Sequence, residues 1–191
     1  MAALTDILVR RVRPADAAAI SALYRPYVET SRITFELDPP DPSEIAARIA
    51  KVAGRYPWIV AERDGALCGY AYATAFRDRP AYRFAVETSI YLAPHAQGCG
   101  LGRRLYEPLL AILTEQGFVH AIGAITLPNP ASVALHERLG FVPVGSYPRV
   151  GFKLGAWAGV GLYQKALSAL PESPQEPAAL ADSALWSAIG R

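Results

Sequence analysis

Gln97-Gly98-Cys99-Gly100-Leu101-Gly102 joins a strand-like run, residues 87–92, to an apolar run of helical period, residues 101–113. Small residues at such a junction let backbone N–H groups approach an anion, and the N-terminus of the helix adds its positive dipole. The loop therefore predicts a pyrophosphate-binding site. A glycine-rich helix cap without a ligand is the alternative that the loop alone leaves open.

Two common nucleotide-binding motifs do not fit this loop. A P-loop has Lys followed by Ser or Thr after its last glycine, but Arg103 and Arg104 stand there. A dinucleotide-binding fingerprint has Gly or Ala at position 103 and an acidic residue at the end of the next strand, and residues 119–127 contain none.

Composition limits the class of protein. The 191 residues suit one domain, and an apolar fraction of 52% with a charged fraction of 19% allows a sizeable core. A net charge of +2 argues against nucleic acid or a membrane surface as partner. No signal peptide or bilayer-spanning run is visible, so we expect a cytoplasmic protein. Cys68 and Cys99 make neither a disulfide framework nor a metal site, so we expect no metal.

Hydrophobic periodicity predicts an α+β protein. Strands are expected over residues 7–12, 58–62, 67–76, 84–92, 119–127, 142–150 and 158–167, with a tight turn at Asp64-Gly65. Helices are expected to begin near Pro14, at Asp41 or Ser43, at Gly100 and at Pro130. This order predicts a mixed, mostly antiparallel central sheet around one parallel crossover, flanked by helices.

Two segments depart from this simple pattern. Pro108 lies inside the third helix, where its missing N–H predicts a kink or an early break. Residues 169–191 form a tail to a main domain of residues 1–168, and residues 171–177 have linker composition. The tail allows a short helix anchored by Leu180, Leu185 and Trp186, which docks on the body, docks on a second subunit or frays.

A third motif fits the opening loop in full. Gln97, Gly100 and Gly102 match Q/R-x-x-G-x-G/A, and the loop resembles the coenzyme A pyrophosphate loop of the GNAT acetyltransferases. In that superfamily a later helix opens with Asn and carries a proton donor two turns on, as Asn129 and His136 do here. The resemblance implies the GNAT acyl-CoA N-acyltransferase fold and acetyl-CoA as cosubstrate. The implied coenzyme-binding residues are Ile90, Tyr91, Leu92, Gln97, Gly98, Cys99, Gly100, Leu101, Gly102, Arg103, Asn129 and Ser132.

Residues 7–167 are also similar to the phosphinothricin N-acetyltransferases, which acetylate methionine sulfoximine and methionine sulfone too. The matching segments include residues 27–31, 34–35, 55–58, 81–82, 87 with 90–92, 116–118, 127–129, 136–137 and 151–153. The resemblance implies a small-molecule amine acceptor, direct transfer of the acetyl group, and a homodimer with its acceptor sites near the dimer contact. Another small amine, a peptide N-terminus or a non-catalytic CoA-binding module are the alternatives.

The same resemblance implies two catalytic residues. Glu87 would take the proton of the acceptor ammonium, since a positioned carboxylate can act as a general base. His136 would protonate the leaving thiolate or orient a water, with Tyr91 or water as alternative acids. The simpler interpretations are a solvated or Arg-paired Glu87 and a core-edge His136 with one hydrogen bond.

Four residues are expected to bind the acceptor. Arg77, Arg79 and Tyr82 lie in one short loop, and guanidinium groups bind carboxylate and phosphinate oxygens well. Phe35 is an apolar ring in a loop, which suits a pocket wall or the core. Three features depart from the family pattern: many GNAT enzymes have Tyr at position 136, residues 44–51 match poorly, and the tail has no counterpart.

Overall fold

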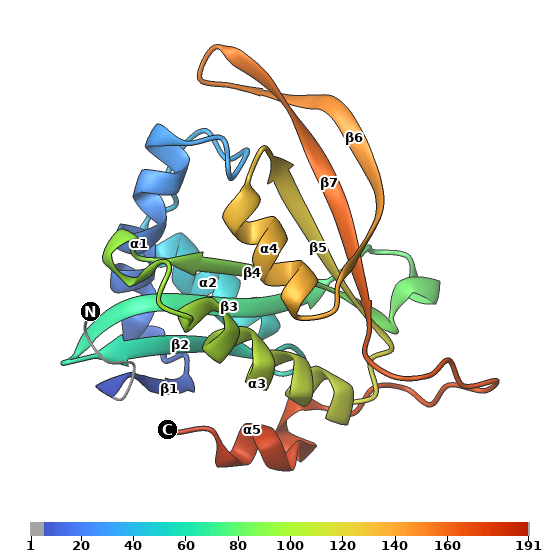
Figure 1. Ribbon diagram of the computed structural model, residues 1–191. Helices are drawn as coiled ribbons and strands as arrows, with labels where there is room; N and C mark the ends of the chain where they lie inside the picture. Colours follow the sequence, from blue (N-terminus) through green and yellow to red (C-terminus); the bar gives the residue numbers. More distant parts are fainter. Residues whose placement is uncertain (1–5, 191) are drawn as a thin grey trace.

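Seven strands form one mixed sheet in the order β1-β2-β3-β4-β5-β7-β6 (Figure 1). The computed structural model describes residues 6–190. The strands are β1 (Leu8–Arg11), β2 (Trp58–Arg63), β3 (Ala66–Ala75), β4 (Ala85–Leu92), β5 (His120–Leu127), β6 (Val142–Lys153) and β7 (Ala156–Ala166). The helices are α1 (Ala17–Thr30), α2 (Pro42–Val52), α3 (Leu101–Glu115), α4 (Pro130–Arg138) and α5 (Ala184–Ala188).

Among residues 6–190, five of the six strand pairings are antiparallel and the β4–β5 pairing is parallel. The α3 helix makes the crossover between them, so the predicted α+β order and the single parallel crossover are confirmed. The β2–β3 turn has both Asp64 and Gly65 in the left-handed region, with φ of 51° and 79°. That conformation is the tight hairpin turn expected for Asp-Gly.

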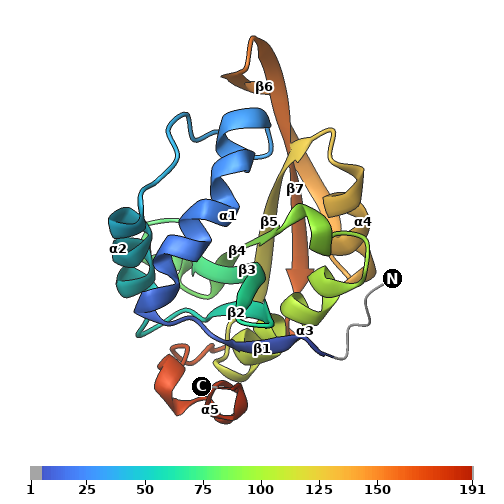
Figure 2. The ribbon, with the colours of Figure 1, turned by 90° about the vertical axis from the view of Figure 1, so that its left-hand side faces the viewer.

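Helices cover the two faces of the sheet (Figure 2). On one face α1 and α2 bury Ile20, Ile45 and Ile49 against the sheet residues Trp58 and Val60. On the other face α3 packs its leucines against Ile59, Ala71 and Val86. Successive residues of β2, β3 and β4 therefore serve two separate cores, as the alternation of side chains along a strand requires.

The α3 helix runs from Leu101 to Glu115 through Pro108, so the expected early break was wrong. Leu105, Leu109 and Leu113 are fully buried on the helix face that packs on the sheet. Burial of such a side chain contributes about 1.5–3 kcal/mol, and a run of them outweighs the ~3 kcal/mol cost of an internal proline. Packing against the sheet therefore keeps this segment helical.

Local cap residues define one end of α2 and one end of α4. Of the two candidates for the second helix, Asp41 is the cap, since its side chain accepts a hydrogen bond from the Glu44 N–H. Gly140 follows α4 with φ of 85°, in the left-handed conformation that ends many helices.

The β6–β7 hairpin extends beyond the body of the molecule (Figure 1, orange). Most of β6 is exposed, and the exposed apolar residues of the hairpin are Val142, Val144, Tyr147, Val150, Phe152, Leu154 and Trp157. We call these residues the hairpin patch.

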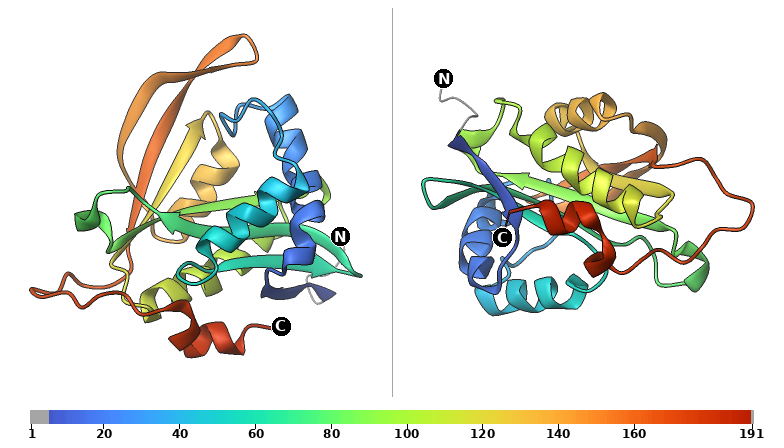
Figure 3. Two further views of the ribbon diagram at one scale, coloured as in Figure 1. Left: turned by 180° about the vertical axis from the view of Figure 1, so that it is seen from behind. Right: turned by 90° about the horizontal axis from the view of Figure 1, so that it is seen from below.

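The tail returns to the body and lies beside α3 (Figure 3, red). Leu180 is 1% exposed, and Glu115 at the end of α3 accepts hydrogen bonds from the N–H groups of Ala184 and Leu185. Trp186 packs on the core and lies under the guanidinium of Arg11. Leu185 was wrongly expected to be an anchor, because its side chain is 44% exposed. Of the three alternatives, the structure shows docking on the body.

Candidate active site

The two parallel strands at the centre of the sheet separate after three residue pairs. Ala85, Val86 and Glu87 of β4 pair with residues 120–122 of β5, and the pairing ends there. Beyond this point a cleft of about 510 Å³ opens between the strands. Its walls come from both strands, from the glycine-rich loop and from α4, including Ile90, Tyr91, Leu92, Gln97, Gly98, Gly100, Gly102, Arg103, Asn129, Ser132 and His136. We call it the central cleft.

The loop at one end of the central cleft is suited to bind an anion. Gly100 is the N-cap of α3 with φ of 88°, and no side chain caps the helix. The first N–H groups of a helix lack partners within it, so those of Leu101, Gly102 and Arg103 remain available to a pyrophosphate. Gly98 has φ of 71°, and a Cβ there would meet nothing within 4 Å. These residues therefore fit the pyrophosphate of coenzyme A.

Three side chains predicted to bind the coenzyme, those of Gln97, Asn129 and Arg103, have different hydrogen-bond or ion-pair partners. The Gln97 Nε2 donates to the Tyr27 hydroxyl at 3.0 Å and lies at the cleft. Asn129 is the N-cap of α4, where its side chain accepts from the Ser132 N–H at 3.2 Å. Arg103 is exposed and pairs with Glu107 at 2.6 Å.

Two residues of the loop could contribute only their backbone. Leu101 is fully buried in the core, and the Cys99 thiol donates to the Ala96 carbonyl at 3.1 Å. Neither of these residues lines the cleft.

Glu87 lies half-buried at the point where the two strands separate. Its carboxylate makes no hydrogen bond among residues 6–190. Burial raises the pKa of Glu87 above 4.5, while the positive charge of Arg77 acts in the opposite direction. A half-buried carboxylate with a raised pKa and a nearby cation has the properties of a general base.

His136 lies on the other face of the sheet, 3% exposed, within a cluster of rings. Its Nδ1 lies 2.8 Å from the Ser132 carbonyl oxygen, which can only accept, so Nδ1 carries a proton. Nε2 lies 3.2 Å from the Tyr106 hydroxyl, whose oxygen is 3.3 Å from the hydroxyl of Thr88. Burial lowers the pKa of His136 below 6.5, which favours the neutral imidazole.

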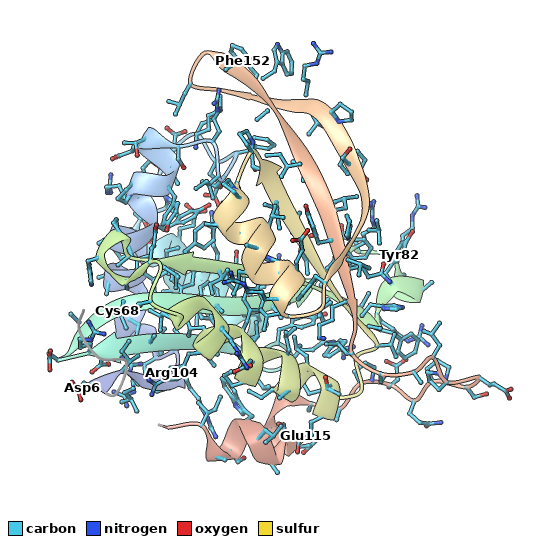
Figure 4. The ribbon with its side chains drawn as sticks, viewed as in Figure 1. Asp6, Cys68, Tyr82, Arg104, Glu115 and Phe152 are labelled. Carbon is cyan, nitrogen blue, oxygen red and sulfur yellow. The ribbon has the colours of Figure 1, made fainter. Side chains whose placement is uncertain are left out.

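The four predicted acceptor residues fall into two separate groups. Arg77 lies over the rings of Phe76 and Tyr82, and Tyr82 is 41% exposed. Arg79 is exposed and precedes the short 3-10 helix of residues 80–82. Phe35 lies beside Gly151 of the hairpin, where its ring occupies the space that a Cβ on Gly151 would need. Figure 4 shows Tyr82 beside the body and Phe152 at the far end of the hairpin.

Three residues at the cleft were missed by sequence reasoning: Tyr27, Thr88 and Tyr106. Tyr27 donates to the Leu92 carbonyl at 2.5 Å and receives the Gln97 amide, so it holds the strand beside the loop. Thr88 and Tyr106 connect β4 to His136. The only sequence signal for Thr88 is its place next to Glu87, since neighbours along a strand point to opposite faces.

Within residues 6–190 no three metal-binding side chains cluster, and no helix is long and apolar enough to cross a bilayer. The Arg104 guanidinium donates to the Ile7 carbonyl at 2.7 Å, which ties α3 to the N-terminal segment.

The fold, the separated strands and the anion-binding loop define an acyl-CoA-dependent acetyltransferase. The chain belongs to the acetyltransferase (GNAT) family, whose model matches residues 20–141. A phosphinothricin N-acetyltransferase of Alcaligenes faecalis is 47% identical over 171 residues, covering 86% of each chain. An L-methionine sulfoximine/L-methionine sulfone acetyltransferase of Salmonella typhimurium is 34% identical over 150 residues, covering 78% of this chain and 88% of the relative.

A solved structure supports the same family. A GNAT superfamily phosphinothricin acetyltransferase from Sinorhizobium meliloti, in complex with acetyl-CoA, superposes with a TM-score of 0.86 at 40% identity. The match covers 90% of this chain and 95% of that one. The protein is therefore an acetyl-CoA-dependent N-acetyltransferase, and the predicted family and cosubstrate are confirmed.

Proposed function

We propose that this enzyme acetylates the α-amine of an amino-acid analogue such as phosphinothricin, methionine sulfoximine or methionine sulfone, by direct transfer in a ternary complex. The observation that carries the proposal is the position of Glu87, where β4 and β5 separate and the central cleft begins. The names of the relatives support this acceptor class.

Glu87 prepares the acceptor nitrogen in this proposal. An ammonium group cannot attack a carbonyl carbon until it loses a proton, and the carboxylate takes that proton directly or through a water. The raised pKa of Glu87 brings its basicity closer to that of an amine. Arg77, with Arg79 and Tyr82, holds the acceptor carboxylate, and Phe35 forms a wall of the site.

Acetyl-CoA supplies the acetyl thioester. The N–H groups of residues 98–103 bind its pyrophosphate, the Asn129 amide and Ser132 face its pantetheine arm, and the exposed backbone of Ile90, Tyr91 and Leu92 pairs with that arm. Backbone N–H groups on this strand also stabilise the developing oxyanion.

His136 acts on the sulfur side of the reaction. Neutral His136 has its proton on Nδ1, so its Nε2 accepts a hydrogen bond from a water or from the Tyr106 hydroxyl. When the C–S bond breaks, a water held in this way gives a proton to the leaving CoA thiolate. Tyr91 fits the role of acid less well, because its ring packs with Tyr24, Tyr27 and Tyr70 on the face where α1 and α2 lie.

The proposal includes a homodimer formed through the hairpin patch. Isolated chains seldom expose so many large apolar side chains together, and such patches mark protein interfaces. Within one chain, Phe35 lies apart from Arg77, Arg79 and Tyr82. In a dimer, the hairpin of the partner would complete the acceptor site. We expect Phe152→Asp to shift the protein from dimer to monomer in light scattering, and a monomeric wild type would contradict this part. A cytoplasmic location stays a prediction.

A thiol-release assay with acetyl-CoA and L-methionine sulfone tests the main proposal. We expect release that depends on the acceptor and a product acetylated at its α-nitrogen by mass spectrometry. Release only with peptides or polyamines would replace the acceptor class. Tight CoA binding without release for any amine would instead identify a non-catalytic CoA-binding module.

A further inference from the structure

Figure 3 (left) shows α2 lying over strands β2 and β3, on the side of the sheet away from α3. A second cavity lies between these elements. It has a volume of about 410 Å³, and its walls are mostly aromatic: Tyr24, Tyr56, Trp58, Tyr70 and Tyr72. Arg48, Lys51 and Asp78 supply its charged groups. We call it the aromatic pocket.

The aromatic pocket begins beside Glu87. Thr74 lines the pocket and is the direct cross-strand partner of Glu87, and directly opposed residues have Cβ atoms ~5 Å apart. Tyr72 and Tyr70 follow at two-residue intervals along β3, so their side chains lie on the same face as that of Thr74. A molecule whose amine reaches Glu87 therefore finds this row of side chains next to it.

Two polar groups at this pocket have no partner. Tyr70 is 2% exposed, and its hydroxyl makes no hydrogen bond within residues 6–190. The Nε1 of Trp58 is buried and also without a partner in this part of the chain. By contrast, the Tyr24 hydroxyl lies 2.6 Å from that of Thr34. Buried polar groups are nearly always paired, so the Trp58 Nε1 is an unmet donor at this cavity. The Tyr70 hydroxyl is not fully enclosed by the protein, so it is open to a water or to a ligand in the pocket.

The Tyr70 hydroxyl can act only as a neutral donor or acceptor at working pH, because burial raises its pKa well above 10. The surrounding rings offer apolar surface to methylene groups. Lys51 has no ion pair within the described chain, whereas Arg48 is paired with Glu36 and Glu44. A ligand with a short aliphatic stem and a terminal oxygen matches these features.

We propose that the aromatic pocket receives the side chain of the acceptor and that the Tyr70 hydroxyl donates a hydrogen bond to an oxygen at its end. The acceptors that fit are amino acids with an aliphatic stem ending in a phosphinyl, sulfonyl or sulfoximine group. This inference rests on the proposed function and assigns a residue that selects among acceptors.

The test compares L-methionine sulfone with L-methionine, which differ only in the two sulfone oxygens. Tyr70→Phe removes the hydroxyl and keeps the ring. We expect kcat/KM for the sulfone to fall about tenfold and that for methionine to stay the same, as expected for loss of one hydrogen bond to substrate. The inference is overturned if the ratio of kcat/KM for the sulfone to kcat/KM for methionine stays the same, whether both values fall equally or neither changes.

Two further measurements keep the test decisive. The Tm of Tyr70→Phe should not fall, because the hydroxyl makes no hydrogen bond to any group of residues 6–190. Isothermal titration of the CoA-bound protein should show sulfone binding about tenfold weaker in the variant. Binding that depends on Tyr70 without acetyl transfer would contradict the proposed function alone, whereas acetyl transfer with an unchanged ratio would contradict this inference alone. A wild type that neither binds nor acetylates the sulfone would contradict both.

Discussion

The Nδ1 atom of His136 lies 2.8 Å from the carbonyl oxygen of Ser132, one turn earlier in α4. This bond fixes the tautomer, since a carbonyl cannot donate, and it leaves Nε2 as an acceptor in the neutral ring. His136 is thus held between a backbone group and the Tyr106 hydroxyl.

We predict that the protein loses stability below pH 6.5 through His136. Burial lowers its pKa in the folded protein, so the unfolded chain binds the proton more readily and acid favours unfolding. The fall in Tm between pH 7.5 and 5.5 should be smaller in His136→Gln than in the wild type. His95→Gln, at an exposed histidine, serves as the control and should leave the fall unchanged. Equal falls in all three proteins would contradict the prediction.

Glu87→Gln should lower kcat about 10²–10³-fold, the size expected for loss of a general base. Because burial raises the pKa of Glu87, the wild-type rate should fall on the acid side at a pH above the 4.5 of an ordinary glutamate. Without the base, the rate of the variant should depend on free amine and rise with pH across the whole range, so the variant should be slowed most at low pH. The comparison is a pH–rate profile beside Glu137→Gln, an exposed carboxylate on α4. An unchanged profile in Glu87→Gln would remove Glu87 as the base.

Gly98→Ala should raise KM for acetyl-CoA, and Gly65→Ala should not. Both glycines have positive φ, 71° and 79°, and a Cβ would meet nothing within 4 Å at either position. The backbone strain of the two variants is therefore alike, about 1 kcal/mol, and only the location differs. Steady-state kinetics with varied acetyl-CoA would show a rise at Gly98 alone if the loop holds the coenzyme. Similar KM values in the two variants would argue against that role.

Leu180→Ala should destabilise the protein by about 2–4 kcal/mol, because a fully buried leucine leaves a cavity when truncated. Leu185→Ala, at a side chain that is 44% exposed, should cost about 0.5 kcal/mol or less. Urea unfolding monitored by circular dichroism compares the two variants. If both variants lose only about 0.5 kcal/mol of unfolding free energy, Leu180 is not part of the core of the body.

Local sequence signals predicted the order of helices and strands because each depends on near neighbours. Asp64-Gly65 was predicted as a tight turn, and Asp41 was one of two cap candidates; the structure confirms the turn and selects Asp41. Pro108 shows the limit of such reasoning. Its helix-breaking tendency is local, but the sheet that buries Leu105 and Leu109 is not adjacent in sequence, and packing prevails.

By itself, the sequence determined the α+β class and predicted the coenzyme loop, since Gly100 and Gly102 lie at the start of a helix whose position is set by local sequence. Only the tertiary structure decided which face each catalytic candidate occupies. The Thr88 hydroxyl lies near the Tyr106 hydroxyl, which is also beside His136. Neighbouring residues of a strand point to opposite faces, so Glu87 lies on the face of the sheet opposite to His136. The setting of Tyr70 is likewise a tertiary property, because the pocket walls around it come from α1, α2, β2 and β3, which are distant in sequence.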